Sequence, residues 1–268
     1  MKRLSPFGVM IEGNNESIDS LSIQNLKKIF HQEHLIVLRG FKGLESEKKF
    51  VAFSESFGEV SLWPFGKVLN LLEQKNPADH IFDHSYIPMH WDGMYRKEVP
   101  EMQIFNCVKA PLSNHGGETL FSFTKKIIED LDAETLMSWE KISFSYKRKM
   151  EFYDSKTTAP LICKHQEKNY PVLRYCEPPS QEDGHFKNHP SFEVHGSKTS
   201  IVNELKEWIY SPKYCLAHKW KDGDVVLADN FTLLHGRKRF TSGSPRHLQR
   251  IQILGTQRIE NPHLEYTR

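Results

Sequence analysis

The residues with the clearest capacity for chemistry are a histidine and an aspartate two positions apart, His90 and Asp92. On a β-strand, side chains two positions apart point to the same side of the sheet, so an imidazole and a carboxylate would share one space. Two histidines and one carboxylate on one side of a metal suit iron(II) and leave positions open for dioxygen chemistry. The pair alone is weak evidence, because the chain contains 14 histidines.

A second group of reactive residue types lies towards the C-terminal end. His235 follows a predicted strand and supplies the third candidate ligand. Arg246 and Arg250 are four residues apart, so on a strand both guanidinium groups would face the same side. A guanidinium binds a terminal carboxylate through two parallel hydrogen bonds, which matches a small dicarboxylate that chelates the metal with its other end. Taken separately, Arg246 also fits a surface or structural ion pair.

The elements that must position these residues follow from apolar periodicity and from turn residues. Apolar residues at helical spacing predict helices over 22–32, 46–57, 125–136 and 200–210. Short apolar runs bounded by glycine and proline predict strands over 34–39, 101–108, 118–123, 172–175, 225–228 and 248–254. Many short strands favour a β-barrel or double-sheet core with helices packed outside it. The polar, turn-rich segment 180–195 predicts a surface loop, and a lid is one reading of it.

Composition excludes several other classes of protein. The 268 residues are 38% hydrophobic and 26% charged with a net charge of +2, which predicts one globular domain over 1–268 and no nucleic-acid partner. Four cysteines without a C-x-x-C pair argue against a zinc ribbon or a disulfide framework. No run of about 18 apolar residues occurs, so we expect no membrane span and a cytoplasmic protein.

Together these motifs resemble the TauD/TfdA family of iron(II)- and 2-oxoglutarate-dependent dioxygenases. The shared pattern is H-x-D at 90–92, Gly-Gly-x-Thr at 116–119, and a histidine at 235 followed by an arginine at 246. The similarity extends over nearly the full chain, from 35–41 and 53–59 to 246–250. The resemblance implies a double-stranded β-helix, a cupin-like jelly roll of mainly β structure with flanking helices.

The resemblance also implies roles for single residues. By position, His90, Asp92 and His235 would bind Fe(II). Thr119 and Arg246 would hold the distal carboxylate of 2-oxoglutarate, and Arg250 would lie near the cosubstrate or the substrate. Dioxygen would be the other cosubstrate.

A closer resemblance connects the chain with the PvcB-like branch of this family, on segments 62–66, 88–95, 174–179 and 232–237. Members of that branch act in bacterial isonitrile biosynthesis, next to an isonitrile synthase. The implied substrate is a small molecule, an amino-acid-derived isonitrile that usually comes from tyrosine. The implied reaction is desaturation or hydroxylation beside the aromatic ring, with or without loss of the carboxylate. A homo-oligomer is compatible with the sequence.

Substrate contacts are less well defined by the sequence. Trp63, Phe65 and Tyr95 are candidates for an aromatic pocket, and plain core packing is the alternative. Arg174 is a candidate partner for a substrate carboxylate, with a structural salt bridge as the alternative. His84 is interpreted as an ordinary loop or strand histidine, and a further ligand is the alternative.

Three other functions compete with this interpretation. One is a dioxygenase of the same family acting on another small carboxylate or sulfonate. Another is a zinc hydrolase built on the same histidines and aspartate, although the chain has no H-E-x-x-H helix. The last is a non-enzymatic, cupin-like binding protein, which would not need the full set of His, Asp, His and Arg.

Overall fold

The computed structural model describes residues 1–77, 79–151, 153–166, 168–179, 190–197, 199–255 and 257–267. Within these ranges the helices are η1 (Ile18–Ser20), α1 (Ile23–Glu33), α2 (Glu47–Glu55), η2 (His80–Phe82), α3 (Thr124–Asp130), α4 (Ala133–Trp139) and α5 (Ile201–Ile209). The two η elements are short 3-10 helices.

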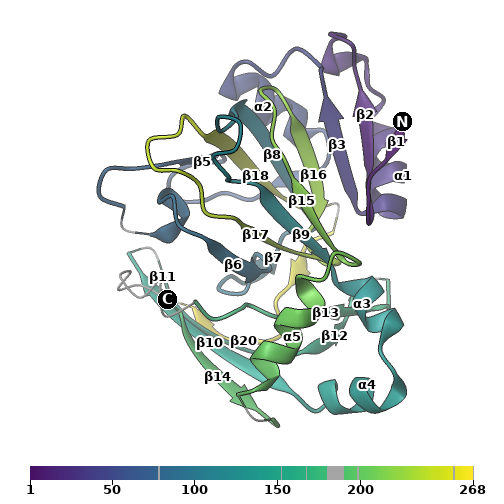
Figure 1. Ribbon diagram of the computed structural model, residues 1–268, viewed down its shortest axis with the longest axis vertical. Helices are drawn as coiled ribbons and strands as arrows, with labels where there is room; N and C mark the ends of the chain where they lie inside the picture. The colour runs from purple at the N-terminus through teal and green to yellow at the C-terminus, as the bar shows by residue number, and fades with distance from the viewer. Residues whose placement is uncertain are drawn as a thin grey trace.

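Two sheets form the centre of the fold (Figure 1). The larger sheet has the order β1 (Lys2–Arg3), β2 (Val9–Glu12), β3 (Leu35–Arg39), β16 (Val225–Asp229), β8 (Met102–Lys109), β18 (His247–Gly255) and β4 (Glu59–Val60), and β5 (Leu69–Leu72) also pairs with β18. The smaller sheet has the order β15 (Cys215–His218), β9 (Thr119–Phe123), β17 (Leu233–Arg237) and β6 (Ile87–His90).

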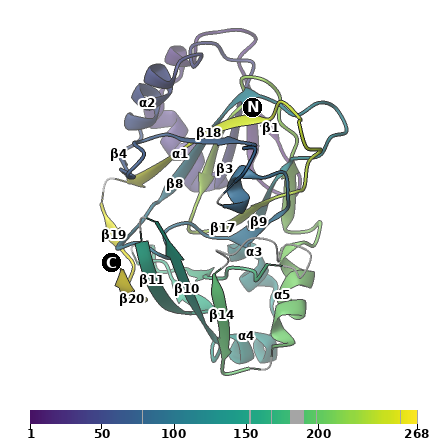
Figure 2. The same ribbon diagram turned by 90° about the vertical axis from the view of Figure 1, so that its left-hand side faces the viewer.

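The remaining strands form three further sheets. Their orders are β14 (Ser191–His195), β10 (Ser143–Met150), β11 (Tyr153–Pro160) and β20 (Leu264–Thr267); β12 (Ile162–Lys164) with β13 (Pro171–Leu173); and β19 (Ile259–Glu260) with β7 (Glu98–Val99). Figure 2 shows β10, β11 and β14 beneath the central sheets, with α3, α4 and α5 beside them.

The central strands of the larger sheet are apolar on both faces because both faces are covered. In β3, Leu35 and Val37 belong to the core between the two sheets, whereas Ile36 and Leu38 pack outwards. The outward face lies against α1 and α2, which bury Phe30 and other apolar side chains there. The inward face lies against side chains of the smaller sheet such as those of β9 and β17. This two-sided burial explains the continuous apolar runs in the sequence.

Several predicted elements agree with the structure, and the helix ends have clear physical causes. Ser22 accepts a hydrogen bond from the backbone of Asn25, and Ser46 accepts one from Lys49, so each serine caps the helix that follows it. The predicted helices 22–32, 46–57 and 200–210 are confirmed as α1, α2 and α5 within a few residues.

Two predictions about segments are wrong in part. The single helix expected over 125–136 is two helices, because the extended backbone of Leu131 ends α3 and Asp132 caps α4 through the Thr135 amide. The loop expected over 180–195 includes strand β14, where Phe192 packs on Phe144 with ring centroids 5.2 Å apart. Residues 180–189 of that predicted loop lie outside the described residues.

Among the described residues, none of the helices combines the length and the apolar character required to cross a membrane.

Candidate metal centre and its cavity

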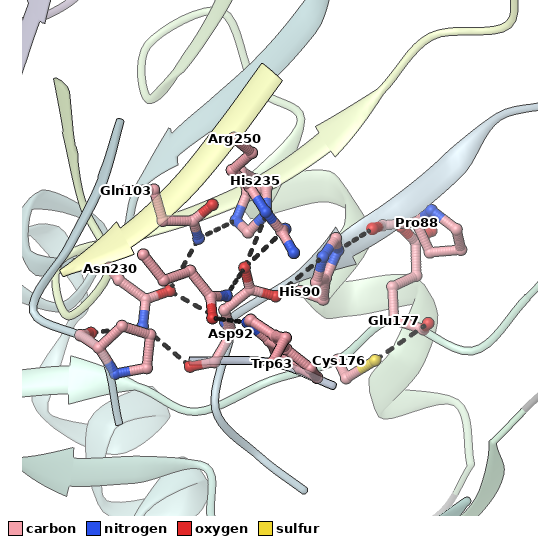
Figure 3. Close-up of polar contacts among 12 residues, drawn as sticks. Trp63, Pro88, His90, Asp92, Gln103, Cys176, Glu177, Asn230, His235 and Arg250 are labelled. Carbon is pink, nitrogen blue, oxygen red and sulfur yellow. Dashed lines mark hydrogen bonds and ion pairs between the residues drawn. The ribbon is translucent and has the colours of Figure 1, made fainter. Parts of the chain in front are cut away.

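The candidate metal centre lies where the last strand of the smaller sheet meets its neighbour. Strands β6 and β17 pair with His90 directly opposite His235, and their ring centroids are 4.2 Å apart. A side chain at Gly236 would prevent this approach, because its Cβ would lie 2.6 Å from the carbonyl oxygen of Ile87 on β6. Asp92 follows β6 in the next turn and points towards both imidazoles (Figure 3).

The ligand atoms of these three residues surround one point. The Nε2 atom of His90 lies 3.7 Å from Oδ1 of Asp92, and Nε2 of His235 lies 4.0 Å from Oδ2. All three candidate ligand atoms lie within 4.8 Å of one another. Nitrogen and oxygen ligands bind transition metals at about 2.1 Å, so atoms that share one ion lie roughly 3–4 Å apart.

The hydrogen bonds of the two histidines favour metal binding through Nε2. The Nδ1–H of His90 donates to the carbonyl of Pro88 at 2.8 Å, which leaves the Nε2 lone pair directed at the centre. The Nε2 atom of His235 is buried and has no hydrogen-bond partner within the described residues. A buried nitrogen without a partner is costly, and a metal ion would satisfy it. The amide of Gln103 lies 3.4 Å from Nδ1 on the other side of that ring.

Electrostatics keep the ligands in the states that bind metal. Burial lowers the pKa of His90, and burial together with the nearby His90 ring lowers the pKa of His235 well below its usual value. Burial alone would raise the pKa of Asp92, but the charge of Arg250 and the two imidazoles outweigh it and bring that pKa to about 2. At neutral pH the site therefore offers two neutral imidazoles and one carboxylate, the donor set that fits iron(II).

Asp92 is held from several directions. Its Oδ2 accepts hydrogen bonds from Nη1 of Arg250 at 2.7 Å and from Nε2 of Gln252 at 2.6 Å. The side chain of Asn230 binds the backbone of Asp92 twice, accepting from its N–H at 2.9 Å and donating to its carbonyl at 2.8 Å. Arg250 therefore contacts the carboxylate of the candidate ligand Asp92 directly, which the sequence did not indicate.

A second feature of the site is a buried arginine that has no acidic partner among the described residues. Arg246 is 4% exposed, and within the described residues its one hydrogen bond runs from Nε to the carbonyl of Gly117 at 3.1 Å. Gly117 has φ +81°, and a Cβ there would lie 3.1 Å from Cδ of Arg246, so the turn that contacts this arginine requires glycine. Burial lowers the pKa of Arg246 to about 10, which leaves the group charged at neutral pH.

Thr119 starts strand β9, two residues after the glycine that contacts Arg246. Its Oγ1 accepts a hydrogen bond from the indole of Trp220 at 3.0 Å, so its own O–H is available as a donor. Thr119 pairs with Arg237 and Phe121 pairs with His235, so Thr119 and the candidate ligand His235 face the same interior two positions apart. That spacing is about 6.6 Å along a strand, close to the length of a five-carbon diacid.

A cavity of about 630 Å³ opens from the metal centre to the surface. The side chains of His90, Asp92 and Arg250 lie at its inner end, and Trp63, Phe65 and Tyr95 line its wall. Trp63 and Phe65 stack at 5.5 Å between ring centroids, and Tyr95 stacks on Tyr153 at 5.6 Å. The three aromatic residues named from the sequence are therefore brought together around one apolar space.

The candidate role of Arg174 as a substrate contact is corrected by the structure. Arg174 is 5% exposed and does not line the cavity. Its guanidinium lies between the rings of Trp91 and Phe231, 4.5 and 4.6 Å from their centroids, and it donates to the carbonyl of Asn230. It is a structural residue held by ring contacts, rather than by the carboxylate that the alternative reading expected.

A second cluster of potential ligands lies nearby, consisting of Glu73, Asp83 and His84. The Nδ1 atom of His84 lies 3.0 Å from Glu73 and 2.7 Å from Asp83. Glu73 also accepts hydrogen bonds from the Ser242 hydroxyl and the Gly243 amide, and Asp83 accepts one from the backbone of His84. The donors and acceptors of this cluster are therefore paired with one another and with the protein.

Several residues around the site were missed from the sequence. They are amide side chains that contact the ligands, namely Gln103, Asn230 and Gln252. The period-two rule that grouped Arg246 with Arg250 would have placed Gln252 on the same face, so a signal for that residue was present. No comparable spacing marks Gln103 or Asn230.

Comparison with known proteins places this geometry among enzymes. The family model described as taurine catabolism dioxygenase TauD, TfdA family matches residues 2–252. The chain is 40% identical to a tyrosine isonitrile desaturase of Pseudomonas aeruginosa, over 97% of this chain and 91% of that protein. It is 38% identical to a 3-((Z)-2-isocyanoethenyl)-1H-indole synthase of Fischerella ambigua, over 95% of each chain.

Solved structures of related proteins have the same fold as this chain. PvcB from Pseudomonas aeruginosa superimposes with a TM-score of 0.82 at 38% identity, covering 97% of this chain and 90% of that chain. A second structure of PvcB, described as an Fe, alpha-ketoglutarate dependent oxygenase from an isonitrile synthetic pathway, gives 0.80 at 37% identity with the same coverage. The expected jelly-roll fold of mainly β structure with flanking helices is confirmed.

Proposed function

The chain belongs to the TauD/TfdA family of dioxygenases, and from this premise we propose that it is an Fe(II)- and 2-oxoglutarate-dependent oxygenase that oxidises tyrosine isonitrile. The observation that carries the proposal is the convergence of two neutral imidazoles and one carboxylate, with the buried Nε2 of His235 lacking a hydrogen-bond partner within the described residues. Iron bound there would supply the oxygen chemistry, with open positions for the cosubstrates.

We propose that His90, Asp92 and His235 bind the iron, and that Thr119 and Arg246 bind the distal carboxylate of 2-oxoglutarate. The buried positive charge of Arg246 has no acidic partner in the described part of the chain, so a dianionic cosubstrate would provide the missing counter-charge. The hydroxyl of Thr119 adds a donor on the same interior face as His235.

Trp63, Phe65 and Tyr95 are proposed to hold the aromatic ring of the substrate. Flat rings on the wall of the cavity match an aryl group, and they exclude water from the inner end where His90 and Asp92 lie. One relative is named for tyrosine isonitrile and another for an indole product, at 40% and 38% identity to this chain. The test must therefore compare a substrate with a phenol ring and one with an indole ring.

The test is anaerobic reconstitution with Fe(II) and 2-oxoglutarate, followed by exposure to air with tyrosine isonitrile and mass analysis of the products. We expect loss of two hydrogens for desaturation or gain of one oxygen for hydroxylation, in each case with 2-oxoglutarate consumed. Tryptophan isonitrile and taurine are the comparison substrates. Turnover with Zn(II) and without oxygen would contradict the proposal in favour of a hydrolase.

The pathway context is part of the same proposal. An isonitrile substrate requires an isonitrile synthase to supply it, so we propose a functional link with such an enzyme. A single domain over 1–268, a cytoplasmic location and self-association stay predictions from the sequence.

A further inference from the structure

The wall of the cavity and the metal-binding carboxylate are joined by one side chain, Gln252 on β18. Its Oε1 accepts a hydrogen bond from the indole N–H of Trp63 at 3.1 Å, and its Nε2 donates to Oδ2 of Asp92 at 2.6 Å. The residue is 3% exposed, and within the described residues these are the two hydrogen bonds of its amide. Both ends of the amide thus point into the site, and neither supports the backbone.

Trp63 is itself fixed in place. The backbone N–H of Ser61 donates to the carbonyl of Gln252 at 2.8 Å, which attaches the loop to β18. Arg96 donates to the Ser61 hydroxyl at 2.7 Å, and its guanidinium lies 4.2 Å from the centroid of the Trp63 ring. The ring of Phe65 stacks on the ring of Trp63 with centroids 5.5 Å apart, which also restricts the orientation in which the indole meets Gln252.

The consequence for Asp92 lies in how its two oxygens are used. Oδ2 accepts charge-assisted hydrogen bonds from both Arg250 and Gln252, so its lone pairs are engaged. Oδ2 lies 4.0 Å from Nε2 of His235, and Oδ1 lies 3.7 Å from Nε2 of His90. Among the described residues both hydrogen bonds to the carboxylate go to Oδ2, so Oδ1 is the oxygen left for a metal. A carboxylate that binds through one oxygen keeps a coordination position open, whereas one that binds through both would occupy it.

We propose that Gln252 is a positioning residue, held by Trp63, that orients Asp92 so that it binds the metal through Oδ1 alone. This inference rests on the proposed function, because it presupposes a metal on His90, Asp92 and His235. It adds that the wall of the substrate cavity and the geometry of the metal are linked through a single amide.

The test uses Co(II), whose absorption spectrum reports the number of ligands around the ion, in the full-length protein without any substrate. We expect Gln252→Leu to shift the Co(II) spectrum and to weaken Co(II) binding about tenfold, as loss of a group that orients a ligand does. Trp63→Phe keeps the aromatic ring but removes the N–H, and we expect a smaller shift in the same direction. The double variant should differ little from Gln252→Leu alone.

Gln249→Leu is the matched control. Gln249 lies on the same strand and is 7% exposed, but its amide binds Asn106 and Asn70 instead of the site. We expect its Co(II) spectrum to equal that of the wild type even where its melting temperature falls. An unchanged spectrum in Gln252→Leu, or an equal shift in Gln249→Leu, would overturn the inference. The proposed function would still stand if the wild type binds Co(II) and consumes tyrosine isonitrile. A wild type that binds no metal would instead refute both.

Discussion

Among the residues that the structure describes, two clusters have the residue types and the closeness of a metal site, but their surroundings differ. His90 and Asp92 line the cavity, and His235 lies opposite His90 on β17, whereas Glu73 follows β5 and Asp83 and His84 lie between the end of η2 and β6. In the second cluster each carboxylate already pairs with the histidine ring or accepts a hydrogen bond from the backbone. In the first, the Nε2 of His235 is buried and unsatisfied within the described residues.

The two clusters differ in where their hydrogen bonds lie, and this difference makes the first a better candidate for a metal site than the second. Proximity of three ligands is common to both clusters, so it decides nothing. In the cavity cluster, the hydrogen bonds go to the far side of the ligands: Pro88 binds Nδ1 of His90, and Arg250 binds Oδ2 of Asp92. On the near side, Nε2 of His235 accepts no hydrogen bond from any described residue, which leaves it available to an ion.

The largest expected effect is that of Asp92→Ala. We expect this change to weaken Fe(II) binding by more than about a hundredfold and to remove turnover, because one of three ligands and the negative charge are lost together. Anaerobic Fe(II) titration and product analysis measure the two effects. Circular dichroism verifies folding, because the change also leaves Arg250 without its carboxylate. Full iron-dependent activity in this variant would show that Asp92 is not a metal ligand, and the first cluster would then have no better claim to a metal than the second.

Arg246→Met comes next and extends the comparison to a buried charge that has no acidic partner in the described part of the chain. We expect the affinity for 2-oxoglutarate to fall roughly a hundredfold, the usual effect of removing one side of a buried, charged hydrogen-bonded pair, while Fe(II) affinity stays unchanged. Calorimetric titration of the Fe(II) protein with 2-oxoglutarate under argon measures it. The control Arg258→Met removes an exposed arginine paired with Glu59 and Glu98 and should change neither affinity.

The pH dependence of metal binding should be weaker than that of ordinary histidines. Two imidazoles with a pKa of about 6.5 would lose about thirtyfold in metal affinity between pH 6.5 and 5.5, because protons compete for their nitrogens. The pKa of His90 and that of His235 are both lowered, so the imidazoles stay neutral further into acid and the loss should be clearly smaller. Fe(II) titrations at the two pH values test this, and a full thirtyfold loss would contradict it.

The smallest effect is expected in the second cluster. Glu73→Gln and His84→Asn should leave metal affinity and turnover unchanged, since these groups bind each other and not an ion. Their partly exposed ion pair should cost about 0.5–1 kcal/mol of unfolding free energy when it is broken. Denaturant unfolding measures that cost, and a loss of bound iron in either variant would show that the two clusters are not different in kind.

The sequence predicted the parts of this molecule that have a local signal. The H-x-D spacing and the distance from His235 to Arg246 appear in the chain itself, and the strands of the larger sheet are apolar because helices cover them. Strands β10 and β11 were not predicted, because polar residues such as those at 147–149 and 154–158 interrupt their apolar pattern. Their apolar partners in other elements are invisible in one sequence.

The side chains were harder to place than the strands. Arg174 looked like a group for a substrate carboxylate, but only the three-dimensional structure shows Trp91 and Phe231 on either side of it. Arg250 was placed near the cosubstrate or substrate, and its contact with Asp92 depends on a turn that spacing does not define. The type of a residue indicates which groups it can bind, but it does not indicate which group it contacts in the folded protein.

Because β6 lies at the edge of the smaller sheet, the stability of the folded protein should depend on bound metal. His90 ends an outermost strand that β17 holds from one side, and His235 lies on β17 itself, so a bound ion would act as a clasp across the open margin. An ion present at a hundred times its dissociation constant adds about 2.7 kcal/mol to the folded state. Without iron, we expect local unfolding to begin at this edge of the sheet, and proteases to cleave the chain there first.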